Sequence, residues 1–398
     1  MSSDASAAPA APAAYDVAIA GAGVAGLTFA CSLRRSRVAL IARAVPPRAD
    51  DVPGLDSRVY AISPGNAAHL DRIGVWQRIP ESLRTPVYGM RVYGDDGRAT
   101  LAFDAYEGGV QAIAWIVEDR RLQGALWDTL AARGAVEVVA PAEAEKLEVD
   151  EAAAILRLRC ERRISARLVV GADGARSLVR SRAGIGVRER DYGQCAVVAN
   201  FACGHSHRNL AWQWFFGGQV LALLPLPGNF VSMVWSVDDA NAARMLRLDP
   251  EELAREAAGA ARGELGALRP AGQAHGFALH RLRAAQIASR RVALLGDAAH
   301  VIHPLAGQGM NLGMQDARSL AQIISSREPG RDAGDAGLLR RYQRARAEDT
   351  MLMDMTVHGL FGLFAHKGTF ARRVRNAGLD LTNRLPLVKN LLLRQAMN

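Results

Sequence analysis

Apolar and polar positions alternate with two different periods along this chain, which predicts a mixed α/β protein. Short runs that are apolar after at most one charged first residue, at residues 16–20, 37–41, 168–171 and 291–295, predict buried strands of a parallel sheet. Small residues follow the first run as far as about residue 33 and predict a helix. The chain is therefore expected to begin with a strand–helix–strand unit.

Two other stretches favour a second, antiparallel sheet. Residues 87–103 and 195–282 alternate with a period of two between turn residues, as half-buried strands do. Within the second stretch, 220–224 and 230–235 are expected to be paired strands, and a helix at 250–268 is expected to cover them. This sheet lies in the sequence between pieces of the parallel one, so it is predicted to be an insertion.

The segment after residues 291–295 is the most informative one. It opens with Gly296-Asp297, continues through a Pro- and Gly-rich loop, and leads into an amphipathic helix. Glycine lets backbone N–H groups come close to a ligand, and a helix start offers unpaired N–H donors to an anion. An aspartate at a strand end can accept hydrogen bonds from ligand hydroxyls, although a Gly-Asp turn alone is also a common structural device. The residues expected around the helix start are Gly307, Gln308, Gly309, Met310 and Asn311.

A second cofactor signal follows the first strand, in the run Gly21-Ala22-Gly23-Val24-Ala25-Gly26. In a dinucleotide fingerprint Gly21 makes the tight turn, Gly23 admits the pyrophosphate, and Gly26 lets helix and strand pack closely. The acid expected at the end of the second strand, which would bind the adenosine ribose, is absent: Ala42 and Arg43 stand there. Residues 50–51, both aspartate, are candidate substitutes from the following loop.

A third signal lies midway, where the apolar run 168–171 ends in Asp173-Gly174. With all three signals in this order, the chain resembles the single-component, class A aromatic hydroxylases, which are FAD-dependent monooxygenases. More narrowly, it resembles the ubiquinone-biosynthesis hydroxylase family over residues 15–398. The stretches that match are the Gly-Asp run and residues 56–62, 117–123, 339–346 and 385–397.

The resemblance implies noncovalently bound FAD, with NAD(P)H as the electron donor. It places the ribityl chain of FAD at Asp297, and both FAD and the donor at the Asp173-Gly174 turn. An arginine fork suits phosphate or flavin oxygens, and a surface salt bridge is the alternative role for the two arginines. The residues expected to contact the cofactor from the matched segments are Arg58, Arg120 and Gln123, and those expected beside the flavin and substrate are His303, Pro304 and Leu305.

The fold class that follows is α/β, with a discontinuous Rossmann-like FAD-binding domain, an inserted β-sheet substrate domain and C-terminal helices. The FAD-binding domain is expected at 15–75, 112–187 and 288–330, and the substrate domain at 76–111 and 188–287. Residues 331–398 are expected to be helical. Residues 1–14, rich in Ser, Ala and Pro and without a signal-peptide pattern, are expected to be a disordered tail.

The reaction implied is hydroxylation of the aromatic ring of a polyprenylated phenol in ubiquinone biosynthesis, with O2 and a C4a-hydroperoxyflavin. The cofactor carries this chemistry, and the sequence singles out no catalytic side chain or phenol-activating base. Two alternatives stay open, because a fold does not fix a function. One is a same-fold flavoenzyme acting on another small aromatic or isoprenoid substrate. The other is a non-catalytic, flavin-bound subunit of a biosynthetic complex.

Composition limits the other function classes. The net charge of +9 comes almost wholly from arginine, since lysine occurs only at Lys146, Lys367 and Lys389, and this bias is typical of a GC-rich genome. We therefore interpret the charge as solvated surface and expect no nucleic-acid partner. No stretch of roughly 20 apolar residues lacks charges, so no spanning helix is expected. The four cysteines show no metal-type or disulfide pattern, which favours the cytoplasm.

Three further features leave alternatives. His300 and His303 have a metal-like spacing but no acidic or cysteine cluster nearby, so no metal site is expected. The aromatic run at 212–216 suits either the core of the sheet or a wall of the substrate site. The apolar and basic residues at 359–375 suit either packing on the FAD-binding domain or peripheral contact with the inner membrane. A ubiquinone-biosynthesis protein complex is also a candidate partner.

Overall fold

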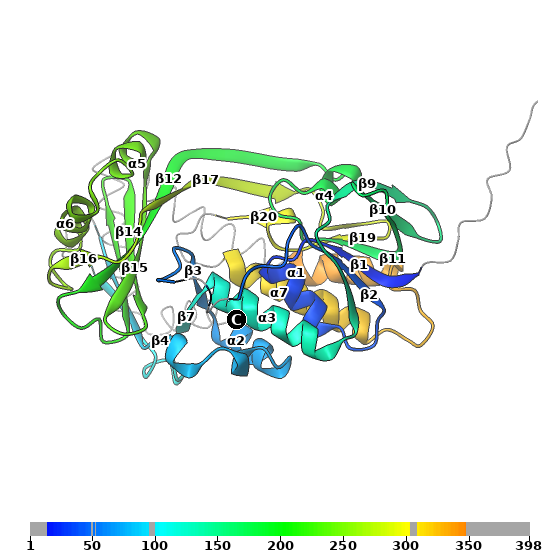
Figure 1. The fold of residues 1–398 in the computed structure, drawn as a ribbon, viewed down its shortest axis with the longest axis horizontal. Coiled ribbons are helices and arrows are strands. Elements are labelled where there is room, and N and C mark those ends of the chain that lie inside the picture. The colour runs from blue at the N-terminus through cyan, green and yellow to red at the C-terminus, as the bar shows by residue number, and fades with distance from the viewer. Residues whose placement is uncertain (1–13, 49–50, 52, 95–99, 303–308, 348–398) are drawn as a thin grey trace, which may run out of the picture.

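The computed structural model describes residues 14–48, 51, 53–94, 100–302 and 309–347. The described residues form two large sheets joined by two long strands, and a small third sheet (Figure 1). The helices are α1 (Val24–Ser32), α2 (Pro64–Arg72), α3 (Asp119–Arg133), α4 (Leu178–Arg182), α5 (Asp239–Met245), α6 (Pro250–Ala260) and α7 (Gly309–Ser325), with a helical segment at 336–347 and 3₁₀ turns η2 (Trp76–Arg78), η3 (Glu81–Leu83) and η4 (Gly296–Ala298).

The strands follow in chain order. They are β1 (Tyr15–Ala20), β2 (Val38–Ile41), β3 (Val59–Ile62), β4 (Thr85–Val87), β5 (Gly89–Tyr93), β6 (Thr100–Asp104), β7 (Ala114–Glu118), β8 (Val136–Val139), β9 (Ala144–Val149), β10 (Ala154–Leu158), β11 (Arg163–Gly171), β12 (Val187–Cys203), β13 (Leu210–Phe216), β14 (Gln219–Leu226), β15 (Phe230–Asp238), β16 (Leu268–Pro270), β17 (His275–Ala284), β18 (Ala288–Ser289), β19 (Val292–Leu294) and β20 (His300–Val301).

The first sheet has the order β18-β19-β11-β1-β2-β8, and its central pairs are parallel. The apolar runs form these strands because both faces of the sheet are covered. Helices α1, α3 and α7 pack on one face, and α4 with the hairpin β9–β10 packs on the other. The Rossmann-like α/β fold is therefore confirmed, and the strand–helix–strand unit at its start is β1–α1–β2.

The second sheet has the order β20-β17-β12-β15-β14-β13-β5-β6, and most of its pairs are antiparallel. The predicted pair at 220–224 and 230–235 is confirmed as β14 and β15. The predicted helix at 250–268 was too long, because α6 ends at Ala260. Positive φ angles at Arg262, Gly263 and Gly266 turn the chain back, and Leu268 begins β16.

The aromatic run of β13 belongs mainly to the core of this sheet. Trp212 and Trp214 lie in the cluster covered by α5 and α6, where Trp214 stacks on Tyr93 with ring centroids 5.6 Å apart. Phe215 belongs to a different cluster, because successive residues of a strand point to opposite faces. The two tryptophans are therefore sheet core, not a wall of the substrate site.

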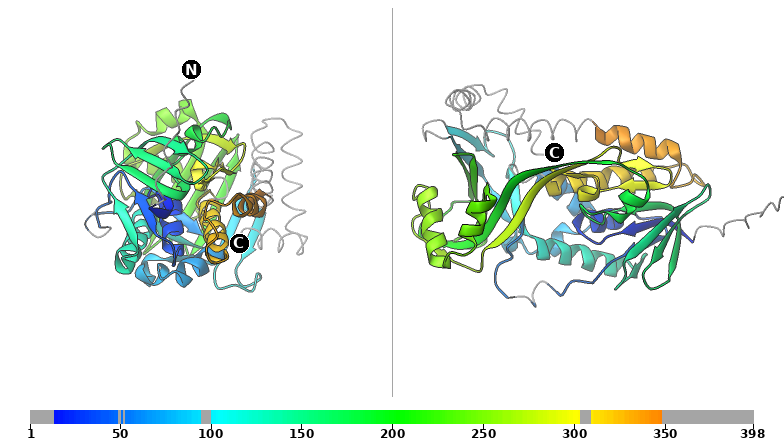
Figure 2. Two further views of the ribbon diagram at one scale, coloured as in Figure 1. Left: turned by 90° about the vertical axis from the view of Figure 1, so that its right-hand side faces the viewer. Right: turned by 90° about the horizontal axis from the view of Figure 1, so that it is seen from above.

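Strands β12 and β17 span the distance between the two sheets as a two-stranded ribbon (Figures 1 and 2). The first part of β12 is mostly exposed and pairs only with β17, while its second part is buried in the second sheet. Their register shifts between Asp191 and Gln194. The small sheet β3-β7-β4 also lies between the larger sheets, where Ile116 of β7 packs with Ala211 of β13.

Candidate active site

The glycines after β1 have the geometry that a dinucleotide site needs. Gly21 has a φ of +107°, and a Cβ there would lie 2.2 Å from the carbonyl oxygen of Ala172. A Cβ on Gly26 would lie 2.2 Å from the carbonyl oxygen of Gly21, so this position fixes how closely α1 packs on the turn. A Cβ on Gly23 would meet nothing within 4 Å. Gly23 is also the N-cap of α1, and because glycine has no side chain to cap the helix, the N–H groups at this helix start can receive a pyrophosphate.

The Gly-Asp turn lies beside this helix. Gly296 has a φ of +55°, and a Cβ there would lie 3.2 Å from the Cβ of Ala25 on α1. Asp297 is exposed, yet the surrounding protein desolvates its carboxyl group and raises its pKa above the usual value. The positive charge of Arg58 and two nearby histidines oppose this rise. An exposed carboxyl group at this turn, beside the N-terminal part of α1, can accept hydrogen bonds from ligand hydroxyls, so Asp297 fits the hydroxyls of FAD.

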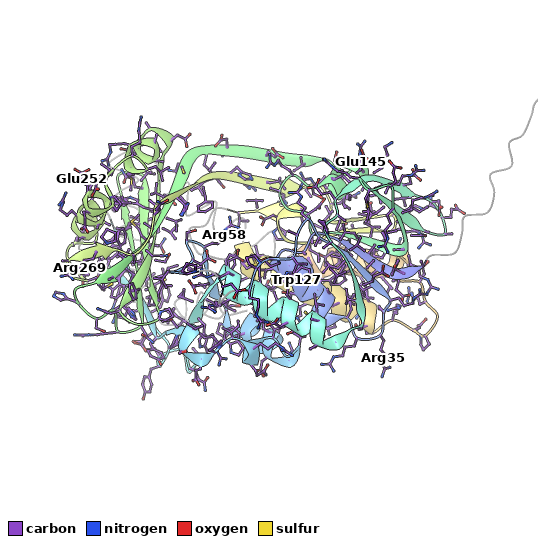
Figure 3. The ribbon with its side chains drawn as sticks, in the orientation of Figure 1. Arg35, Arg58, Trp127, Glu145, Glu252 and Arg269 are labelled. Atoms are coloured by element: carbon purple, nitrogen blue, oxygen red, sulfur yellow. The ribbon has the colours of Figure 1, made fainter. Side chains whose placement is uncertain are left out.

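Arg58, the residue before β3, lies near both Asp119 at the start of α3 and Asp297 in η4. Gln123 Nε2 donates to Asp119 Oδ1 at 2.8 Å, and Arg58 interacts with both Asp119 and Asp297 through its charge. The Arg58 guanidinium lies 5.2 Å from the ring centroid of Phe277 on β17. Arg58 is exposed and stands between the two large sheets (Figure 3).

The Arg120 side chain, unlike that of Arg58, contacts residues at the edge of the site. Its guanidinium donates to the carbonyl oxygen of Gly54 and lies 3.2 Å from Glu118 Oε1, and its backbone N–H donates to Asp56. It lines an open hollow of about 350 Å³ between residues 53–57 and the second sheet. The sequence placed Arg120 with Arg58, whereas the structure gives it internal partners at the edge of the site.

The carboxylate of Asp173 accepts its hydrogen bonds from neighbouring residues of the protein. One of its carboxylate oxygens accepts from the backbone N–H groups of Leu178 and Val179, at 2.8 and 3.1 Å, and the other accepts from the hydroxyl of Ser177. These contacts cap the N-terminus of α4. Gly174, with a φ of +82°, completes the turn. A cofactor contact at this turn would therefore come from its backbone.

The start of α7 is anchored through Asn311. Its side chain accepts from the Ser63 backbone and from Asn66, and donates to the carbonyl oxygen of Ala61 at 2.8 Å. Asn311 is almost fully buried, so it holds the N-terminus of α7 against β3 and α2. Gly309 and Met310 open the helix as predicted, while the predicted site residues His303, Pro304, Leu305, Gly307 and Gln308 lie outside the described residues.

A buried charged network that the sequence did not reveal lies directly below the Gly-Asp turn. Asp316 of α7 accepts from the Gly296 backbone N–H at 3.1 Å, and its carboxylate lies 2.7 Å from His300 Nε2 and 2.8 Å from Arg346 Nε. All three charged side chains are at least 96% buried. The network therefore joins the turn, α7 and the helical segment 336–347.

Electrostatics keep the network charged. Burial opposes protonation of His300, but the charge and hydrogen bond of Asp316 outweigh it, so the pKa of His300 is raised. Burial likewise opposes ionisation of Asp316, yet His300 and Arg346 hold the pKa of its carboxyl group below the usual value. His300 was considered in the sequence only as a metal ligand. The described residues contain no cluster of three or more metal-ligating side chains.

No acidic residue follows β2 at the position expected to bind the adenosine ribose of FAD. Ala42 is buried there, and Arg43 forms an ion pair with Glu143 at 2.7 Å. Asp51 is exposed and Asp50 lies outside the described residues.

Comparison with known proteins agrees with this architecture. A family model for an FAD binding domain matches residues 14–354. Ubiquinone hydroxylase UbiL of Rhodospirillum rubrum is 34% identical over 96% of this chain and 89% of its own length. The 3-demethoxyubiquinol 3-hydroxylase of Escherichia coli is 33% identical over 96% of this chain and 98% of its own. The crystal structure of pqsL, a probable FAD-dependent monooxygenase from Pseudomonas aeruginosa, has a TM-score of 0.76 at 24% identity, covering 92% of this chain and 99% of that one.

The FAD binding domain and the two relatives named as hydroxylases define an FAD-dependent monooxygenase of the aromatic hydroxylase class. The two relatives match almost the whole chain at more than 30% identity. The chain belongs to the ubiquinone-biosynthesis hydroxylase family.

Replacing Asp297 by alanine tests the carboxyl group at the centre of this site. We expect the FAD Kd to rise about tenfold to a hundredfold, because hydrogen bonds to a charged group contribute about 1.5–3 kcal/mol. The thermal stability of the apoprotein should not change, since Asp297 is exposed. Flavin fluorescence titration measures the Kd, and Asp128→Ala, at an exposed position of α3, is the matched control. A Kd within twofold of wild type would contradict the assignment.

Proposed function

We propose that this protein hydroxylates the aromatic ring of a polyprenylated phenol on the route to ubiquinone, with FAD, NAD(P)H and O2. The observation that carries the proposal is the identity of 34% and 33%, over 96% of the chain, to relatives named ubiquinone hydroxylase and 3-demethoxyubiquinol 3-hydroxylase. The position of Asp297 and Arg58 between an FAD-type fold and a second sheet supports a reaction at this seam.

We propose the following roles for the chain's own residues. The turn at Gly21, Gly23 and Gly26 receives the pyrophosphate, and Asp297 accepts from the ribityl hydroxyls. Arg58 balances the charge of Asp297 and, with Gln123, holds the flavin edge. The start of α7 stabilises negative charge on the reduced ring. Support comes from the close packing of the glycines, the exposure of Asp297 and the anchoring of α7 by Asn311.

We further propose that the chain is divided into a discontinuous FAD-binding domain and an inserted substrate domain at 76–111 and 188–287. The strand order of the two large sheets supports this division.

When bound, FAD supplies the redox and oxygen-transfer chemistry, and the protein positions the reactants and excludes water. The face of the second sheet turned away from α6 supplies the wall of the substrate site in this proposal. Gln213 and Phe215 lie on that face, opposite to the two tryptophans.

A polyprenylated phenol is a membrane-derived molecule, so the protein must reach its proposed substrate at a membrane or through other proteins. Within the described residues, no helix has both the length and the apolar character needed to cross a bilayer. We propose that the protein reaches its substrate at the bilayer surface or within a complex of ubiquinone-biosynthesis proteins. The basic, apolar stretch at 359–375 supports surface contact by its composition.

A series of phenols with tails of increasing length tests the proposed substrate. Each buried methylene contributes about 0.8 kcal/mol, which corresponds to roughly a fourfold change in kcat/KM. A single added isoprene unit should therefore raise kcat/KM severalfold with the purified, FAD-loaded protein. Oxygen uptake coupled to mass-spectrometric detection of the hydroxylated ring measures the reaction. Equal kcat/KM for tailless and prenylated phenols would favour a small, soluble aromatic substrate, and absence of reduction by NAD(P)H would favour a non-catalytic subunit.

A further inference from the structure

We propose that an arginine-lined hollow at the far ends of α1, α2 and α7 binds a ligand that carries a multiply charged phosphate group. The ligand is either the headgroup of an anionic lipid or a free polyphosphate. The hollow has a volume of about 710 Å³, within the roughly 300–1,000 Å³ of small-molecule sites. Its charged and titratable lining residues are Arg34, Arg35, Arg72, Arg318, Arg327 and His69.

The charged side chains that line the hollow are basic, although one of them, Arg327, also forms an ion pair with Asp16 at 3.8 Å. Its five arginines come from the ends of two helices, from the body of α7 and from the residue that follows its C-terminal turn, and no aspartate or glutamate is among its lining residues. Guanidinium groups converging from several elements suit a phosphate, because each can donate two parallel hydrogen bonds to its oxygens. Like charges that line one hollow repel each other, and a bound anion would reduce this repulsion.

Capping of helix C-termini explains only part of the cluster. Arg327 donates to the carbonyl oxygens of Ile324 and Arg331 at 2.8 and 3.1 Å, and Arg34 donates to that of Arg72 at 3.3 Å. Among the residues that the structure describes, the side chains of Arg35 and Arg72 have no hydrogen-bond or ion-pair partner. These two exposed guanidinium groups are therefore available to a ligand.

The pKa of His69, one of the residues that line the hollow, depends on burial and on this positive charge. His69 is buried beside Ser32, whose hydroxyl oxygen lies 3.0 Å from His69 Nε2. Burial and then the charges of Arg318 and Arg72 lower the pKa of His69 to about 4. A bound phosphate would oppose these charges and raise that pKa, so His69 is a reporter within the site.

The hollow is separate from the flavin site. Helix α7 begins at that site, and its first residue that lines the hollow is Arg318, about 14 Å along the helix from Gly309 at about 1.5 Å per residue. Arg35 lies at the opposite end of the molecule from Glu252 and Arg269 of the second-sheet region (Figure 3). A ligand here would therefore not contact the flavin or the substrate ring, and the inference does not depend on the proposed reaction.

The test uses the FAD-loaded full chain with inorganic pyrophosphate as the probe. We expect calorimetry to show saturable binding, and NMR to show that saturation raises the pKa of His69. Arg35→Gln with Arg72→Gln should weaken binding tenfold or more, because it removes charge-assisted hydrogen bonds. Both side chains are exposed and without described partners, so the fold should be unchanged. The matched control is Arg255→Gln with Arg269→Gln, which removes the same charge at exposed positions of the second-sheet region and should stay within about twofold.

Vesicles distinguish the two sources of phosphate. Binding to phosphatidylcholine vesicles that contain phosphatidic acid, whose phosphomonoester can carry two charges, identifies a lipid headgroup if it is weakened by the hollow variant and displaced by pyrophosphate. Pyrophosphate binding without vesicle binding identifies a free polyphosphate, and either result supports the site. Equal weakening in the control variant would show only diffuse surface charge and overturn the proposal. An unchanged pKa of His69 at saturating pyrophosphate would overturn it as well.

Discussion

Asp316→Ala is expected to lower the free energy of unfolding by about 3–5 kcal/mol, because it leaves two buried cations without their anion. The carboxylate of Asp316 lies within 2.8 Å of both His300 Nε2 and Arg346 Nε, and it also accepts from the Gly296 backbone. Loss of these bonds should release the Gly-Asp turn and weaken FAD binding too. Urea denaturation of the apoprotein measures the first effect, and flavin titration measures the second.

The pH dependence of stability gives this prediction a second readout. The pKa of Asp316 is lowered in the folded protein, so its stabilisation is present above the ordinary carboxyl pKa and is lost as pH falls. The pKa of His300 is raised, so its stabilisation is present below the ordinary histidine pKa and is lost as pH rises. In Asp316→Ala, the loss of folding stability at low pH and the loss at high pH should therefore both be smaller than in the wild type.

A surface ion pair provides the control for Asp316. Glu256 accepts two hydrogen bonds from Arg244, at 2.7 and 2.8 Å, but both side chains are more than a third exposed. Glu256→Ala should therefore cost no more than about 1 kcal/mol. A cost for Asp316→Ala as small as this would show that the buried network does not hold the turn.

Gly26→Ala and Gly23→Ala are expected to separate folding from cofactor binding. A Cβ on Gly26 meets the Gly21 carbonyl oxygen at 2.2 Å, and a backbone atom cannot yield as a side chain would. We expect a loss of about 3 kcal/mol in the free energy of unfolding, which exceeds the gain of about 1 kcal/mol from alanine's helix propensity. Thermal or urea denaturation of the apoprotein measures it.

The Gly23 variant should behave in the opposite way. Its added methyl group meets nothing within 4 Å, and its φ of −73° suits alanine, so the apoprotein should lose less than about 1 kcal/mol. The methyl group does stand at the N-terminus of α1, where the pyrophosphate is proposed to lie, so the FAD Kd should rise about tenfold or more. Unchanged FAD affinity would move the pyrophosphate away from this helix.

The sequence predicted what depends on local pattern. Apolar runs identified β1, β2, β11 and β19, and the glycine fingerprint identified a turn whose positive φ and close packing the structure contains. These features are readable because each is decided within a few residues. The same locality explains why α6 was predicted too long: its helical composition continues past Ala260, and only the backbone angles at Arg262 and Gly263 end it.

The remainder of the site depends on partners distant in sequence. Asp316 is 16 residues from His300 and 30 from Arg346, and no local pattern in the sequence pairs the three side chains. The Asp173-Gly174 turn shows the opposite problem, because a recognisable motif does not say whether its carboxylate meets a ligand or, as here, caps α4. The assignments of individual cofactor contacts therefore stay predictions.

The position of β19 has a consequence for how the chain is synthesised. This strand pairs with β11 in the interior of the first sheet, and α7 covers the same sheet, yet both follow the inserted strands in sequence. When the ribosome has synthesised residues 1–284, all strands from β5 to β17 have been made, but β19, which pairs with β11, has not. The inserted sheet can therefore pair its strands while the first sheet still exposes an apolar edge, and the nascent chain needs protection there until α7 has emerged.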